Sequence, residues 1–239
     1  MDMVGQLFIV ATPIGNLKDI TQRAIEILSS IELIACEDTR KTGLLLQKLE
    51  IKNKPKLLSY YEENEQGRIP QIINLLKQGK NVALVSNAGT PTISDPGYKL
   101  VKECLQQGIK VESIPGPSSV LTALTSSGLP TDKFLFLGFL PKKEGKRKTI
   151  LKTLPKKTTI IFFESPFRLL KTLKELKEIW GDIEIVICRE LTKVFEEIRR
   201  EKISSSIDYF EKNKIKGELT LCFNIPLESK YRRSVSLTL

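Results

Sequence analysis

The sequence predicts an α/β protein with two domains, because short apolar runs alternate with helical patterns in its first half and long polar loops follow several of those runs. This alternation is typical of a mostly parallel sheet covered by helices on both faces. At 239 residues the chain can form two small domains that each bury a core. The pattern changes after Pro115, so we expect an N-terminal α/β domain over 1–116 and a C-terminal domain over 117–239.

In the first domain the expected strands are short and apolar, and they fall at 6–10, 32–36, 56–60, 81–86 and 110–114. Asp19, with Gln22 three residues later, resembles a capping box for a helix over 20–28. Ser118 is placed to cap a further helix over 120–125.

In the second domain strands are expected at 134–139, 158–163, 183–188, 195–203 and 218–225, with fewer helices between them. This pattern predicts an α+β domain with a mixed sheet. Phe134, Phe136 and Phe139 lie in a strand that is apolar throughout, so we expect them in the core and not in a base-stacking surface.

The loop at 86–97 is the most informative stretch of the chain. It follows the buried strand Val82 to Val85, contains two glycines and two prolines, and supplies several polar side chains at the strand's carboxyl end. A structural turn needs about 2–6 residues, so a loop of this length favours a binding site over a plain connection. Similar loops at 11–17 and 115–119 follow two other strands, and the three could line one crevice.

Several kinds of protein are excluded by what the sequence lacks. No GxGxxG or P-loop spacing occurs, and there is no histidine, so we expect neither a zinc site nor a Ser-His-Asp triad, and no metal. The cysteines are isolated, which favours buried, reduced thiols at Cys36, Cys104, Cys188 and Cys222. Without an apolar stretch of about 18 residues or a signal-peptide pattern, we expect a cytoplasmic protein with no membrane partner.

Positive charge is concentrated in the second domain. Residues 1–116 carry a net charge of +1 and residues 117–239 a net charge of +9. The densest segment is 141–148, which we interpret as a flexible loop that contacts RNA phosphates. The alternative is a solvated surface run. The cations of this segment are Lys142, Lys143, Lys146, Arg147 and Lys148.

Seven sequence blocks are spread over most of the chain, at 8–17, 35–40, 84–97, 114–118, 134–141, 163–166 and 189–193. Together they resemble the small-subunit ribosomal RNA methyltransferase I family, within the tetrapyrrole-methylase-like S-adenosylmethionine enzymes. The resemblance implies two α/β domains with the cofactor in a cleft between them. It also implies methylation of the ribose 2′-hydroxyl of a cytidine in small-subunit RNA, and we expect a homodimer.

The resemblance also implies the site residues. The cofactor contacts carried over are Pro13, Ile14, Gly15, Gly89, Thr90, Ile93, Ser118, Ser119, Phe163, Leu191 and Glu218. The ribose hydroxyl must lose a proton, for which the acceptors near the expected cleft are Glu37, Asp38, Asp95 and Glu164. Arg40 could neutralise a phosphate. Alternatively, residues 37–40 cap a helix over 39–49, and one sequence can serve both purposes.

This chain departs from the family pattern at position 87, where Asn87 stands in place of the usual aspartate. Lys41, Tyr61 and Phe167 occupy positions where the family often has histidine. Two alternatives therefore stay open: methylation of a tetrapyrrole such as a precorrin, and an RNA-binding module in which Asn87 marks impaired activity.

Overall fold

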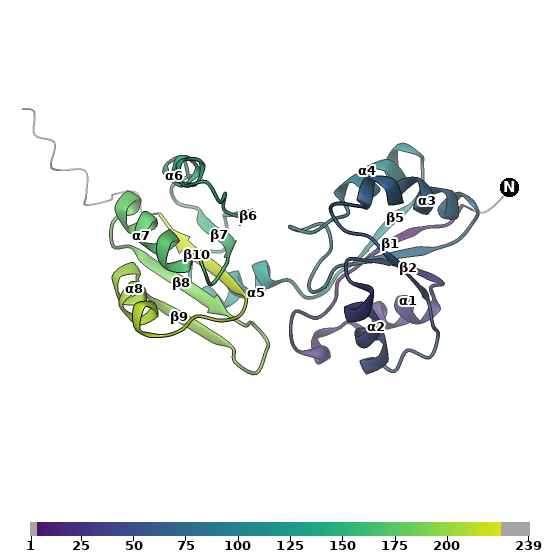
Figure 1. Ribbon diagram of the computed structural model, residues 1–239, viewed down its shortest axis with the longest axis horizontal. Helices are drawn as coiled ribbons and strands as arrows, with labels where there is room; N and C mark the ends of the chain where they lie inside the picture. The colour runs from purple at the N-terminus through teal and green to yellow at the C-terminus, as the bar shows by residue number, and fades with distance from the viewer. Residues whose placement is uncertain (1–3, 226–239) are drawn as a thin grey trace, which may run out of the picture. The chain divides into compact units, whose positions relative to one another are not determined.

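The computed structural model describes residues 4–225 and divides into two compact units, one ending at Ser118 and the other beginning at Ser119 (Figure 1). Each unit is built around its own five-stranded sheet.

The sheet of the first unit is parallel throughout, as the sequence predicts. Its strands run in the order β3-β2-β4-β1-β5. Their bounds are β1 Leu7–Val10, β2 Leu33–Cys36, β3 Lys56–Ser59, β4 Val82–Val85 and β5 Val111–Ile114. Every residue of β2 and β4 is buried, because both faces of these strands are covered.

Helices cover both faces of this sheet, which confirms the predicted architecture (Figure 1). The helices α1, Gln22–Ser30, and α2, Thr39–Lys48, pack on one face, where Leu28 and Leu46 meet Val85. The helices α3, Glu65–Lys77, and α4, Tyr98–Gln106, pack on the other, where Ile72 and Leu100 meet Leu84.

The start of α1 differs from the prediction. The Thr21 hydroxyl, not a capping box at Asp19, accepts a hydrogen bond from the Ala24 N–H at 3.1 Å. Asp19 instead lies in a short 3₁₀ turn, Leu17–Asp19, which Asn16 caps. The predicted start is wrong because Ser, Thr, Asp and Asn can all cap, and the sequence pattern does not say which one the backbone places at the helix end.

The second unit contains the predicted mixed sheet, in the order β6-β7-β10-β8-β9. Only β6 and β7 are parallel neighbours, and the other pairs are antiparallel. The bounds are β6 Phe134–Phe139, β7 Thr159–Glu164, β8 Glu184–Arg189, β9 Glu197–Lys202 and β10 Leu219–Asn224.

This unit has more helix than the sequence suggests. Helices α6, Glu144–Lys152, α7, Leu169–Trp180, and α8, Ile203–Lys212, connect its strands and form one core with the sheet. Helix α5, Ser119–Ser127, packs against β7 and β10, and its buried residues lie outside that core. The segment 141–148, expected as a loop, is therefore mostly the first turns of α6.

The expectation that Phe134 and Phe139 lie in the core is also wrong. Their side chains are 43% and 59% exposed. Strand β6 is an edge strand, and an apolar run does not reveal whether both faces of an edge strand are covered. Phe136 and Phe139 instead contact Phe163 edge-to-face, at ring-centroid distances of 4.9 and 5.4 Å.

All four cysteines are buried and free of disulfides, as predicted. Among residues 4–225, no helix has the length and apolar character needed to cross a membrane. In the same range, no three His, Cys, Asp or Glu side chains are grouped as metal ligands.

Candidate functional site

A crevice is expected at the carboxyl ends of β1 and β4, which are neighbouring inner strands of the first sheet. From β1 the chain passes across β4 to reach β2, and from β4 it passes across β1 to reach β5. The connections therefore leave two adjacent parallel strands in opposite directions. Ligands of open α/β sheets bind outside the carboxyl ends of strands at such a switch point.

Backbone and side-chain hydrogen bonds bring the three predicted loops together there. Thr12 and Gly89 exchange two backbone hydrogen bonds of 2.9 Å, which join the loops after β1 and β4. The Thr90 hydroxyl donates to the Pro117 carbonyl at 3.1 Å and ties in the loop after β5. Gly89 has φ of +78°, and a Cβ there would lie 3.4 Å from Ile14, so glycine suits this position.

Two polar atoms in these loops are buried and have no hydrogen-bond partner among the described residues: Thr12 Oγ1 and Asn87 Oδ1. The Thr12 side chain is almost fully buried. Buried polar atoms nearly always have a partner, since leaving one unpaired costs about 1–3 kcal/mol. Both atoms are therefore suited to pair with polar groups of a ligand.

The loop 86–97 is held in an unusual backbone conformation. Thr92 and Ser94 have φ of 74° and 62°, in the left-handed region that residues with a Cβ rarely adopt. Gly97 has φ of 134°, and a Cβ there would lie 2.6 Å from a Leu84 side-chain carbon. Backbone strain of this kind concentrates at ligand-binding sites.

Two of the predicted proton acceptors, Glu37 and Asp95, lie in one group with Ser86 and Asn87. The Asn87 N–H donates to Glu37 at 3.4 Å. Burial raises the pKa of Asp95 to about 6, the Ser86 hydrogen bond acts against that rise, and the Glu37 charge adds to it. A carboxylate with a pKa near neutrality is suited to accept a proton.

Asp38 and Arg40 lie at the start of α2, and the capping interpretation of this block is confirmed. Asp38 is the N-cap of α2, accepting from the Arg40 N–H at 2.9 Å, and it also forms an ion pair with the Arg40 side chain. The bonds from Arg40 lower the pKa of Asp38 to about 2, so this carboxylate is a weak proton acceptor. The Arg40 side chain is 89% exposed.

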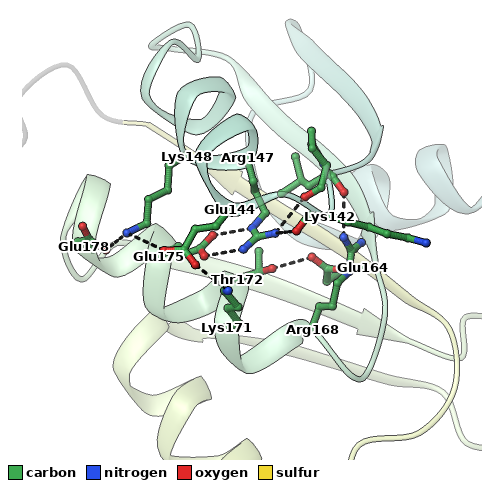
Figure 2. A network of polar contacts seen from close by, with 12 residues as sticks. Lys142, Glu144, Arg147, Lys148, Glu164, Arg168, Lys171, Thr172, Glu175 and Glu178 are labelled. Atoms are coloured by element: carbon green, nitrogen blue, oxygen red, sulfur yellow. Dashed lines mark hydrogen bonds and ion pairs between the residues drawn. The ribbon is translucent and has the colours of Figure 1, made fainter.

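In the second unit, Glu164 is buried, and both of its carboxylate oxygens have partners (Figure 2). It accepts from the Thr172 hydroxyl at 2.7 Å and from the Ser165 N–H at 2.7 Å, and it pairs with Arg168 at 2.6 Å. These three contacts give Glu164 a structural role, because they join the end of β7 to the start of α7.

The remaining predicted cofactor residues outside the first loops lie in three places. Phe163 contacts the rings of Phe136 and Phe139 edge-to-face. Leu191 is buried in the turn after β8, and Glu218 precedes β10 beside that turn, since Lys193 pairs with both Glu190 and Glu218, at 2.8 and 2.9 Å. Ser118 and Ser119 mark the passage from β5 to α5.

The basic segment is corrected in one respect: Arg147 does not present its charge to solvent. It is 1% exposed, and its guanidinium binds both carboxylate oxygens of Glu175 at 2.6 Å (Figure 2). Lys148 pairs with Glu178 and Glu144 at 2.8 and 3.4 Å. Lys142, Lys143 and Lys146 remain exposed.

Thr12 is a residue of the candidate site that sequence reasoning did not select, and Ser86 was expected only as one of the polar side chains of the loop 86–97. Each is the first polar residue after a buried strand, so the signal was present. Only the structure shows that the Thr12 hydroxyl is buried without a partner among the described residues and that the Ser86 hydroxyl donates to the Ala88 carbonyl at 3.1 Å.

The family model of the tetrapyrrole (corrin/porphyrin) methylases matches residues 6–206, so the chain belongs to this class of methylases. A uroporphyrin-III C-methyltransferase structure from Thermus thermophilus superposes with a TM-score of 0.67 at 18% identity, covering 92% of this chain and 95% of that one. A cobalt precorrin-4 methyltransferase structure gives 0.65 at 21%, covering 91% and 94%. At these identities the likeness concerns the fold.

Sequence relatives are more specific. A ribosomal RNA small subunit methyltransferase I from Thermotoga maritima is 53% identical over 91% of this chain and 97% of its own length. The protein of the same name from Escherichia coli O157:H7 is 46% identical over 91% of this chain and 77% of its own. The chain therefore belongs to the ribosomal RNA small subunit methyltransferase I family.

Proposed function

We propose that the protein transfers a methyl group from S-adenosylmethionine to the ribose 2′-hydroxyl of a cytidine in small-subunit ribosomal RNA. Relatives named for methylation of this RNA, at 46–53% identity, support the substrate class. The observation that carries the proposal is the group of residues at the carboxyl ends of β1 and β4. There Thr12 Oγ1 and Asn87 Oδ1 are buried without a partner among the described residues, the Asn87 N–H donates to Glu37, and the Glu37 charge acts on Asp95.

The residues of the crevice fit the cofactor. The unpaired oxygens of Thr12 and Asn87 suit its polar groups, and the glycine backbone at Gly89 lets a ligand approach closely. The proposed contacts of the first unit are Pro13, Ile14, Gly15, Gly89, Thr90, Ile93 and Ser118, and those of the second are Ser119, Phe163, Leu191 and Glu218. When bound, the cofactor supplies a methyl group already activated on a sulfonium.

The protein's own contribution is alignment and removal of a proton. Holding two reactants in line can supply about 7–11 kcal/mol of the barrier. A ribose hydroxyl is a poor nucleophile, so a carboxylate that takes its proton speeds the reaction by about 10²–10⁴-fold. We assign this role to Asp95, which its burial and the neighbouring Glu37 keep basic.

Replacement of Thr12 by valine tests the site with a change that keeps the side-chain shape. Removing an unpaired buried hydroxyl should raise the stability of the ligand-free protein, because its desolvation cost disappears. The same change should weaken cofactor binding by about 2- to 12-fold, the range expected for one hydrogen bond. Calorimetry with S-adenosylhomocysteine measures the affinity.

Thr42→Val is the matched control, since Thr42 is a buried threonine of the same unit whose hydroxyl interacts with Cys36. It should lower stability and leave the affinity unchanged. Saturating cofactor at about 100 times Kd should stabilise the parent by about 2.7 kcal/mol. If millimolar cofactor neither releases heat nor raises the melting temperature of the parent, the proposed activity is wrong.

We propose further that the protein works in the cytoplasm, where small subunits are assembled and used, and that it is a homodimer. Light scattering at several concentrations measures the oligomeric state. A monomer mass at all concentrations would refute the proposed homodimer.

A further inference from the structure

One corner of the second unit combines exposed aromatic rings with exposed lysines. We call it the aromatic–lysine corner, and it consists of Phe139, Lys142, Lys143, Lys146 and Phe167. Phe167 is 98% exposed, so its ring contributes almost nothing to the packing of its own unit. An exposed aromatic ring beside unpaired cations is not explained by the fold.

The strand arrangement brings Phe139 and Phe167 to the same end of the second sheet, where β6 and β7 end. Strands β6 and β7 are parallel, and Phe139 at the end of β6 pairs with Phe163 near the end of β7, after a shift in register that follows Phe136. Phe167 lies in the turn that follows β7, where its N–H donates to the Ser165 hydroxyl at 3.3 Å. Both rings therefore belong to segments at the carboxyl ends of two neighbouring parallel strands.

Two arginines then fix the segment that carries the lysines. Arg168, the neighbour of Phe167, donates to the Leu140 carbonyl at 3.0 Å. Arg147 donates to the carbonyls of Pro141 and Lys142, at 2.9 and 3.0 Å. Three consecutive carbonyls are thus held from inside the unit, and the turn bearing Phe167 is tied to the segment bearing Lys142.

Each arginine is in turn held by a buried glutamate (Figure 2). Arg147 binds Glu175 through two bonds of 2.6 Å, and Arg168 pairs with Glu164 at 2.6 Å. Most of the acidic side chains around α6 are neutralised as well, because Glu144 pairs with Lys171 and Lys148 and Glu178 pairs with Lys148. No ion pair is found for Lys142, Lys143 or Lys146 among the described residues, so their charges face outward uncompensated.

We infer that the aromatic–lysine corner binds single-stranded RNA, with Phe167 stacking on a base and the three lysines contacting phosphates. The inference rests on the proposed function, since it names residues of the second unit that hold the substrate RNA. Proteins that bind single strands combine exposed aromatic rings with cations in this way. A duplex would hide the base faces that an aromatic ring can stack on.

The net charge of +9 over residues 117–239 favours RNA over a protein partner as the occupant. A second copy of the chain would bring the same positive charge to the contact. Self-association through Phe167 is therefore an outcome that the experiment must separate from RNA binding.

The test uses the full chain and a fluorescent single-stranded RNA of about 12 nucleotides, within the length that one binding fold covers. Phe167→Ala should weaken binding by about 5- to 150-fold, the effect of losing one base stacked on an aromatic ring. It should leave the dependence on salt unchanged. Phe167→Trp keeps a flat ring and should bind like the parent.

Replacing Lys142, Lys143 and Lys146 by glutamine should produce the complementary result. Each phosphate contact in a single strand contributes about 0.7 to the log–log slope of affinity against salt, so the slope should fall by about 2. Phe195→Ala is the control for exposed aromatic area, because Phe195 is 71% exposed but follows β8, which β10 separates from β7. It should bind RNA like the parent.

Equal losses for Phe167→Ala and Phe195→Ala, or an unchanged salt slope in the lysine variant, would overturn the inference. Dissociation of a dimer by Phe167→Ala without loss of RNA affinity would also overturn it and assign the corner to a second copy. Cofactor affinity, measured separately by calorimetry, should be the same in every variant. The parent protein could also bind cofactor and methylate small subunits without binding the single-stranded RNA. That result would refute RNA binding by the aromatic–lysine corner and would leave the proposed function unchanged.

Discussion

Breaking the buried pair between Arg147 and Glu175 should destabilise the second unit far more than breaking an exposed pair of the same length. The two side chains are 2% and 6% exposed. Glu175→Ala would leave a buried guanidinium with only the carbonyls of Pro141 and Lys142 as acceptors. Removing one partner of a buried ion pair costs about 3–5 kcal/mol. With an m value of about 2 kcal/mol per molar urea, the unfolding midpoint should fall by about 1.5–2.5 M.

The matched control is Glu211→Ala, because Glu211 pairs with Lys174 at the same 2.6 Å while both side chains are about half exposed. Exposed pairs contribute about 0–1 kcal/mol, so the control should move the midpoint by less than about 0.5 M. The assay is urea unfolding followed by the fluorescence of Trp180, the single tryptophan, which lies in α7 with Glu175.

A double variant, Arg147→Met with Glu175→Leu, should recover most of the stability, since apolar side chains of similar size can replace a buried pair at little cost. It should still bind RNA weakly, because the Pro141 and Lys142 carbonyls lose their donor. Equal midpoint shifts for Glu175→Ala and Glu211→Ala would refute the reasoning that burial makes the first pair important.

Three further predictions concern the crevice. Methyl transfer should rise with pH and be half-maximal near pH 6, because Asp95 can accept a proton only when ionised. Asp95→Asn should remove this dependence and lower single-turnover rates by about 10²–10⁴-fold, and an unchanged pH profile in this variant would assign the proton to another group. Asn87→Asp should leave turnover close to that of the parent, since Asp95 remains the proton acceptor in this variant, and a hundredfold gain in the same assay would contradict this. Gly97→Ala should weaken cofactor binding and lower the melting temperature, because the added Cβ would lie 2.6 Å from a Leu84 side-chain carbon and the backbone there has φ of 134°. Gly145→Ala is the control: a Cβ there meets nothing within 4 Å, so neither quantity should change.

The positions of the strands and of the crevice loops could be predicted from the sequence. Short runs of β-branched and aliphatic residues ended close to where β1, β2 and β4 end. The loops after β1 and β4 contain glycine and proline, which mark the ends of these two strands locally. In a parallel sheet the loops that follow the strands lie at the same end of the sheet. Local patterns were therefore sufficient to predict that the loops bearing Thr12, Asn87 and Asp95 lie in one region.

The features that the sequence did not predict depend on contacts between distant residues. Arg147 looks like one more cation in a basic run, and only Glu175, 28 residues later, draws it into the interior and supports α6. The exposure of Phe139 follows from the place of β6 at the sheet edge, which is a property of topology. The structural role of Glu164 likewise depends on Thr172 and Arg168, which lie on the next helix or at its start.

Transfer of labelled methyl from S-adenosylmethionine to isolated small ribosomal subunits tests the central claim most directly. We predict one methyl group per subunit, on the ribose 2′-oxygen of a cytidine, located by mass spectrometry of RNA fragments, and strongly reduced transfer by Asp95→Asn. A label on a base or on ribosomal protein would contradict the account. So would transfer to a tetrapyrrole but not to RNA, or cofactor binding with no transfer to subunits at all.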